Sequence, residues 1–336
     1  MTTHRWGIAA VLAAVVLSGC HKALTPAAKQ GYASAATPRE RVATDRVAEN
    51  LAYRAYYNSD AAALATLEVR AKTDPAFRGG LYKFYTLEAS HFGPDMGTPL
   101  LTKAIRGIST PRAAEHEHKR EALIARAETD QQKDQTRLQK KSLLLLEQAV
   151  AKNDPAAENA LAGEYWSEPN RAMAVEEAGG VSQVKMNDEN QAWFKAARTM
   201  CTDGFRLAQK SLAAGWPGAY MTLVLFHLTP KGPIERTSSA MTTTEFMLAT
   251  QCAGQAYPSS IPSALRNSAS LTRYAAQHGS IRAIAEEVIR ACSGGQKRAT
   301  ARWLRQLKKL ATAGSVRAQI DLKAMIAYAH SRCGVK

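Results

Sequence analysis

A short pattern that recurs along the chain constrains its fold more than any other feature. Residues 71–85 (AKTDPAFRGGLYKFY) and 151–165 (AKNDPAAENALAGEY) share Ala-Lys-x-Asp-Pro-Ala, then a leucine and a tyrosine in register. Further copies lie at 213–227 and 311–326, and a weaker copy without the leucine lies at 275–287. A Gly, Asn or Thr in each copy can end a helix, and proline two residues later suits the first turn of the next one. The pattern therefore predicts helix–turn–helix units, in which an alanine four residues after the turn lets two helices approach closely and a leucine fills their shared core.

The remaining sequence agrees with an all-α protein. Alternating β-branched runs are missing, whereas alanine-rich segments with apolar residues three and four positions apart recur. The 336 residues, 46% of them hydrophobic, are enough to bury a sizeable core. We therefore predict helices throughout, with two long insertions between the repeats. Residues 113–154 contain no Gly or Pro and could form one or two long helices, whereas 230–263 is rich in Pro, Ser and Thr and predicts a long loop around a short helix.

The recurring pattern resembles the Sel1-like repeats, relatives of the tetratricopeptide repeats, with their A-x-x-G-x-x-x-A-x-x-x-L signature. The turn residues lie 80, 62, 64 and 35 residues apart, and only the last step is close to one regular helical repeat. The resemblance implies an irregular α-solenoid of helical hairpins over residues 41–336. The alternative is a set of unrelated helical hairpins that share only their turn chemistry.

The first residues have the features of an export signal. Arg5 precedes the apolar run Ile8–Leu17, which is too short to span a bilayer but suits a secretory signal. The run ends in Leu-Ser-Gly-Cys, which resembles the lipobox of bacterial lipoproteins. That resemblance implies a signal peptide over 1–19 and a lipidated Cys20, and the alternative is an ordinary signal peptide with a chance cysteine.

The residues after the lipobox predict where the protein is held. His21 stands where many inner-membrane lipoproteins have Asp, so the family analogy favours the periplasmic face of the outer membrane of a Gram-negative cell. Residues 20–40 are small and polar, with two prolines, and we expect them to form a flexible tether between the lipid and the folded body.

Four cysteines follow the tether, all in the last 40% of the chain: Cys201, Cys252, Cys292 and Cys333. An even number in an oxidising compartment predicts two disulfides, with three possible pairings; buried free thiols are the alternative. Their spacing does not match a CxxC metal site.

No motif in the chain indicates catalysis. The HExxH, GxSxG, P-loop and GxGxxG patterns are all absent. The run Glu115–His118 alternates acid and histidine, but on a helix its two histidines point in different directions and cannot share a metal ion. We expect no cofactor, no metal and no enzyme, and a hydrolase whose site is assembled only by the fold is the alternative.

The C-terminal end carries most of the excess positive charge. The whole chain has a net charge of +15, and residues 281–336 hold twelve Lys or Arg against three acids. On a helix over 297–314, Trp303, Leu307 and Leu310 would share one face. The opposite face would carry four cations, the candidate partner-binding residues Arg298, Arg302, Arg305 and Lys309.

These features predict a binding protein. Nucleic acid is the usual partner of such a face, but an exported, lipid-anchored protein would not meet it. We expect an acidic protein, with anionic envelope polymers as further candidates. Sel1-like lipoproteins of this size resemble immunity proteins that neutralise toxins delivered by secretion systems, phospholipase-type effectors among them. The alternatives are an outer-membrane scaffold or adaptor, a solvated basic face without a partner, and the hydrolase considered above.

Replacing Cys20 with alanine tests the anchor. The C20A variant has no sulfur to carry the diacylglycerol, so we expect it to leave the membrane fraction and appear in the soluble periplasmic fraction. Fractionation followed by immunoblotting measures this, and an unchanged distribution would remove the lipoprotein assignment.

Overall fold

The computed structural model describes a helical body. Its described residues are 37–90, 99–100, 103–104, 130–178, 183–185, 188–228, 240–242 and 261–335. The predicted leader, Cys20 and the first part of the tether lie outside them, as do Glu115–His118 and Cys252.

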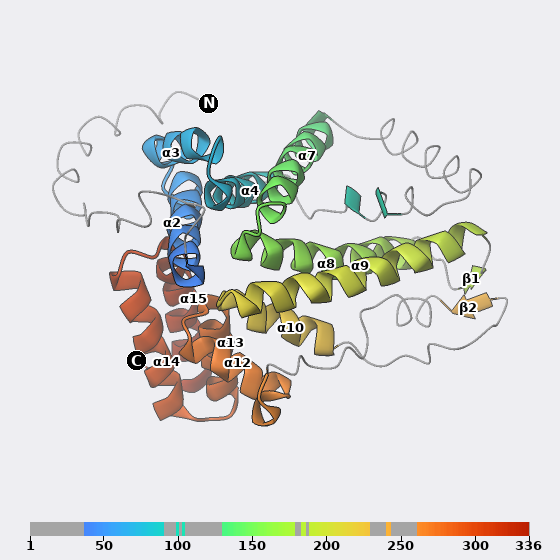
Figure 1. The fold of residues 1–336 in the computed structure, drawn as a ribbon. Coiled ribbons are helices and arrows are strands. Elements are labelled where there is room, and N and C mark those ends of the chain that lie inside the picture. Colours follow the sequence, from blue (N-terminus) through green and yellow to red (C-terminus); the bar gives the residue numbers. More distant parts are fainter. Residues whose placement is uncertain are drawn as a thin grey trace, which may run out of the picture.

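The described part of the chain is all-α apart from one short pair of strands (Figure 1). It contains eleven α-helices and one short 3₁₀ helix. The helices are α2 (Pro38–Tyr57), α3 (Ala61–Ala71), α4 (Pro75–Ser90), α7 (Asp130–Val150), α8 (Pro155–Ala178), α9 (Asp188–Ala213), α10 (Gly218–Leu228), α12 (Ser268–Gln277), α13 (Ile281–Ser293), α14 (Lys297–Thr312) and α15 (Val316–Cys333), with η1 at Ser263–Leu265. Most of them pack against their neighbours in sequence. None of these helices combines the length and the apolar character that a membrane span needs.

All five predicted turns join two helices. They connect α3 to α4 at Thr73, α7 to α8 at Asn153, α9 to α10 at Gly215, α12 to α13 at Gly279, and α14 to α15 at Gly314. Four of the five turn residues, all except Thr73, have a positive φ, between 57° and 94°. This is the left-handed conformation that glycine adopts without strain and asparagine tolerates, which explains why the pattern selects them.

The positions after each turn are buried in register. The fourth residue has an exposed fraction of 0–1% in every copy: Phe77, Ala157, Ala219, Ala283 and Ala318. The eighth residue is a buried leucine in the first three copies, Leu81, Leu161 and Leu223. In the copy at 275–287 this place is taken by Glu287, which is 2% exposed and is neutralised by Arg273 and Arg290.

The core consists of four overlapping clusters that follow the chain. The first joins α2, α3 and α4; the second joins α4, α7, α8 and α9; the third joins α8, α9, α10 and α12; and the last joins α10 and α12 to α15. Close approaches make this possible. A Cβ at Gly80 in α4 would lie 2.8 Å from the carbonyl oxygen of Ala48 in α2, so only glycine fits there.

A short strand pair departs from the expectation of helices throughout. Strands β1 (Gln183–Lys185) and β2 (Ala240–Thr242) pair in the antiparallel direction, with Val184 opposite Met241. Strand β2 lies within the predicted insertion 230–263, so part of that insertion is tied to the connection between α8 and α9 (Figure 1).

The helical body begins three residues inside the predicted tether. Thr37 caps α2, because its Oγ1 accepts from the backbone N–H of Glu40 and the Glu40 carboxylate accepts from the N–H of Thr37, at 3.3 and 2.8 Å. Pro38 follows at the first position of the helix, where the missing N–H costs nothing.

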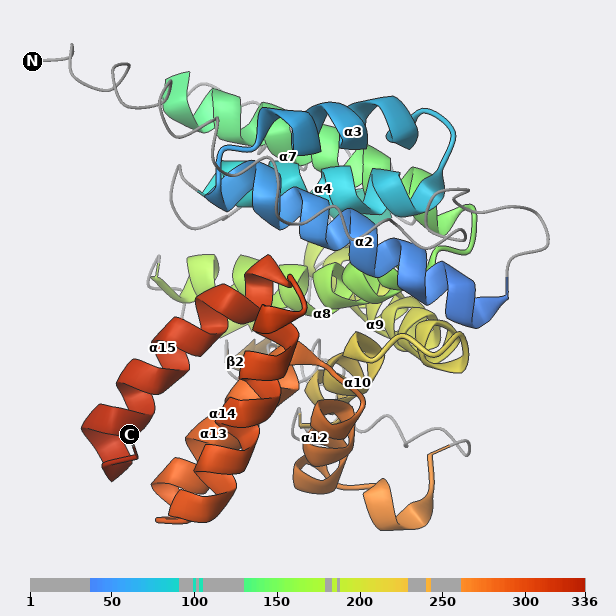
Figure 2. The same ribbon diagram turned by 90° about the vertical axis from the view of Figure 1, so that its left-hand side faces the viewer.

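Helix α2 also reaches the other end of the chain. The Asn50 side chain donates to the carbonyl oxygen of Gly314 at 3.0 Å and accepts from the N–H of Val316 at 2.9 Å. It thereby binds both sides of the α14–α15 turn. Figure 2 shows α15 meeting α2, so the first and last described helices are in contact.

Removing this side chain should weaken the whole fold. The Asn50→Ala change breaks two hydrogen bonds and leaves the Gly314 carbonyl and Val316 amide without that partner, so we expect a loss of about 1–3 kcal/mol in the free energy of unfolding. Urea denaturation followed by circular dichroism measures it. Gln277→Ala, at an exposed position of α12, is the control and should change little; equal midpoints for both variants would contradict the bridging role.

Candidate functional site

The predicted cationic face is present on α14. Arg298, Arg302, Arg305 and Lys309 are all exposed. The opposite side of the helix is buried against α13 and α15 and consists of Thr300, Trp303, Leu307 and Ala311. In Figure 2, α14 stands at the front of the C-terminal helices, beside α15. We call these four exposed cations the α14 cationic face.

The three acids of residues 281–336 form ion pairs with arginines that do not belong to α14. Glu286 pairs with Arg282 at 3.3 Å within α13, and Asp321 pairs with Arg317 at 2.9 Å within α15. Glu287, the third acid, pairs with Arg290 and, at 3.5 Å, with Arg273.

No acid within the described residues forms an ion pair with the α14 cationic face. Exposed cations that have no ion-pair partner among the described residues can attract an acidic group by Coulomb forces.

A disulfide holds the helices on either side of this face. Cys292 near the end of α13 is joined to Cys333 at the end of α15, with 5.6 Å between their Cα atoms. The bridge closes a loop of 41 residues that contains all of α14. Cys201 lies buried in α9 and is also disulfide-bonded, whereas Cys252 lies outside the described residues.

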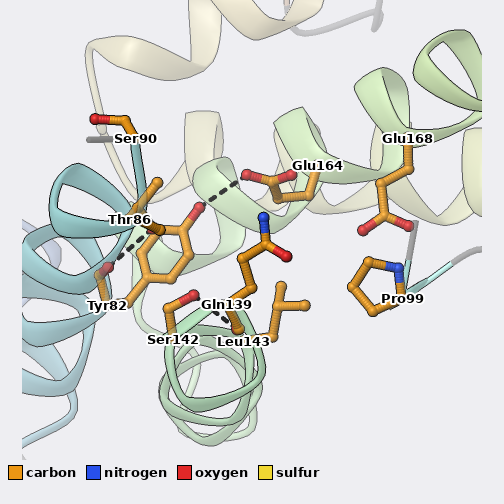
Figure 3. A pocket seen from close by; sticks show the side chains of 10 residues that line it. Tyr82, Thr86, Ser90, Pro99, Gln139, Ser142, Leu143, Glu164 and Glu168 are labelled. Carbon is orange, nitrogen blue, oxygen red and sulfur yellow. Dashed lines mark hydrogen bonds between the residues drawn. The ribbon is translucent and has the colours of Figure 1, made fainter. Parts of the chain in front are cut away.

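A cavity of about 450 Å³ lies among α4, α7 and α8 (Figure 3). The Tyr82 hydroxyl donates to Glu164 Oε1 at 3.0 Å across it. Glu168, one turn further along α8, is only 1% exposed, and Gln139 of α7 and Pro99 complete this part of the lining. The cavity thus has two carboxylates on one wall and an aromatic ring on another.

The chemistry of this cavity is that of a hydrogen-bonding pocket. Thr86 Oγ1 donates to the carbonyl oxygen of Tyr82 at 2.9 Å, and Ser142 Oγ donates to that of Gln139 at 2.8 Å (Figure 3). Both hydroxyls therefore donate to backbone rather than to a base that would activate them. The described lining contains no histidine, cysteine or lysine.

A titratable cluster lies where α2 meets α4 and α15. Glu49 is half-buried there, with Lys83, Arg317 and Arg46 as the surrounding cations. Burial raises the pKa of the Glu49 carboxyl, and the three cations lower it by less. Burial likewise raises the pKa of Tyr53, which lies 5.7 Å from both Lys83 and Arg317. The ionised Glu49 therefore costs folding energy at this junction.

The described residues contain no group of three His, Cys, Asp or Glu side chains arranged to hold a metal ion. The sequence located the α14 cationic face, because a single helix creates it. It did not indicate the cavity, since Tyr82 and Glu164 lie 82 residues apart in the chain, on different helices, and neither is unusual in its local sequence.

Comparison with known proteins identifies no relative. No family model matches the chain, and neither a curated protein nor a solved structure is significantly similar to it.

The junction at Glu49 predicts a pH-dependent stability. A carboxyl whose pKa is raised on folding lowers stability once the pH exceeds its ordinary value, 4.5 for glutamate. Glu49→Gln removes this cost, so we expect the variant to be more stable than the wild type at pH 7. Its advantage should shrink as the pH falls through the raised pKa and vanish below 4.5.

Thermal unfolding between pH 4 and 8 measures this difference. The control is Glu68→Gln, at an exposed position of α3. If the difference in stability between the wild type and the Glu49→Gln variant does not shrink as the pH falls, burial does not govern the pKa of this carboxyl.

Proposed function

We propose that this protein is a lipid-anchored component of the outer membrane whose folded body, in the periplasm, binds an acidic protein through the α14 cationic face. One observation carries the proposal: four cations are exposed on one helix face, while all three acids of the same region pair with arginines of other helices. The leader sequence supports the location.

A protein surface suits the geometry of this face. The cations are spaced over three helical turns, and the helix is fixed below by Trp303 and Leu307, which are at most 3% exposed. The disulfide between Cys292 and Cys333 restrains the flanking helices. The helix backbone that carries these cations is thereby held in place, and their fixed spacing along it favours a partner with carboxylates at matching positions. Flexible anionic polymers of the envelope would be bound less selectively.

We further propose that the hairpins are eroded Sel1-like repeats. Support comes from the turn residue, the small buried residue four positions later and the buried leucine eight positions later. By analogy with Sel1-like lipoproteins, the partner would be a toxin delivered into the periplasm, and the bound protein would cover an acidic patch or the active site of that toxin.

Charge reversal on α14 tests the binding face. The wild type, immobilised on a column, should retain its partner from periplasmic extract. The variant with Arg298, Arg302, Arg305 and Lys309 all replaced by Glu should retain much less of it. With the partner so identified, we expect its association rate constant to fall by about tenfold to a hundredfold at low salt and its salt dependence to flatten. Surface plasmon resonance at several salt concentrations measures both.

The control variant carries the same change in charge elsewhere. Its four Glu replacements are at the exposed positions Arg39, Lys140, Lys152 and Lys195. Equal slowing by both variants would show that net charge alone matters, and no slowing would show that α14 is a solvated surface. A captured toxin that loses activity supports the immunity role, whereas captured envelope machinery indicates an adaptor.

A further inference from the structure

A groove lies at the other end of the molecule, between α3 and α7. Both helices pack on α4, and α4 forms the floor between them with Leu81 and Tyr85, which are 6% and 8% exposed. The groove encloses about 510 Å³. In Figures 1 and 2 it belongs to the end formed by α3, α4 and α7, away from α14.

The walls of this groove are unusually apolar for a surface. Val69 of α3 is 64% exposed and Leu144 of α7 is 56% exposed, and they are the two most exposed large hydrophobic side chains of the described residues. Both line the same groove, together with the partly buried Leu145. Apolar walls above an apolar floor favour the burial of a partner's side chains, because each covered patch is removed from water.

Charges at the rim indicate the sign of the partner. Lys72 and Lys141 are exposed there, against one acid, Glu68. The Lys141 ammonium donates to the Tyr85 hydroxyl at 2.6 Å and lies 4.0 Å from the centre of its ring, which fixes this cation beside the groove floor. A second copy of the chain would bring another +15 of net charge, which disfavours self-association and favours an acidic occupant.

We propose that the groove docks an amphipathic acidic segment of another protein. Apolar side chains of that segment, one helical turn apart, would contact Val69, Leu144 and Leu81, and its carboxylates would pair with Lys72 and Lys141. This is the helix-in-groove mode of recognition. The site is separate from the α14 cationic face and does not depend on what that face binds.

A peptide selection tests the proposal without knowledge of the partner. The full chain, purified in detergent, is used to select from a phage library of random 16-residue peptides. We expect enriched peptides with two apolar residues three or four positions apart and flanking Asp or Glu. The double variant Val69→Asp, Leu144→Asp should bind them at least about tenfold more weakly, and Lys72→Glu, Lys141→Glu should also weaken binding.

The matched control is Ile289→Asp, Ile326→Asp, which changes two exposed hydrophobic residues outside the groove and should bind the peptides like the wild type. Because Val69 and Leu144 are mostly exposed, the groove variant should keep the wild-type dichroism spectrum, which separates lost binding from lost folding. The proposal is overturned by three outcomes: no enrichment, enriched peptides that are basic or bind the groove variant equally, or a dimer of the wild type in sedimentation that the groove variant abolishes.

Discussion

The close approach of consecutive helices is the constraint on which this structure depends. Four of the five turns are followed, four residues later, by an alanine that is at most 1% exposed, as at Ala157 and Ala283. A side chain of one carbon lets the second helix lie against its neighbour, and in the first three copies a buried leucine eight residues after the turn fills the space that the helices share. Because each helix then packs mainly on its neighbours, the core forms as a chain of overlapping clusters rather than as one centre.

The same local packing determines which arginines pair with the three acids of residues 281–336. At the position where three other copies have a buried leucine, the copy at 275–287 has Glu287, and a buried carboxylate requires cationic partners. Arg273 of α12 and Arg290 of α13 supply them. The other two acids of the region are bound by arginines one turn away on their own helices. Within the described residues, the three acids of this region therefore pair with arginines of α12, α13 and α15, and none of them pairs with the exposed cations of α14.

Local features could be predicted from the sequence, and distant ones could not. The turn at Gly314 and the orientation of α14 follow from residues within a few turns of each other. The contact of Asn50 with that turn joins residues 264 positions apart, and nothing in the local sequence of either indicates it. The groove has one local signal in the sequence: the four leucines at 143–146 extend around most of a helix, so they cannot all be buried, and Leu144 faces solvent.

Helix α2 connects the two proposed binding surfaces. It packs on α3 and α4 beneath the groove and contacts α15 beside α14, so it joins the end that carries the groove to the end that carries α14 (Figures 1 and 2). The α14 cationic face acts through charge, which in physiological salt extends over about 8 Å. The groove acts only at van der Waals contact. An acidic partner long enough to reach both surfaces would be drawn to α14 first. Its contact with the groove would then form within the same complex, which raises the effective concentration of the second binding segment.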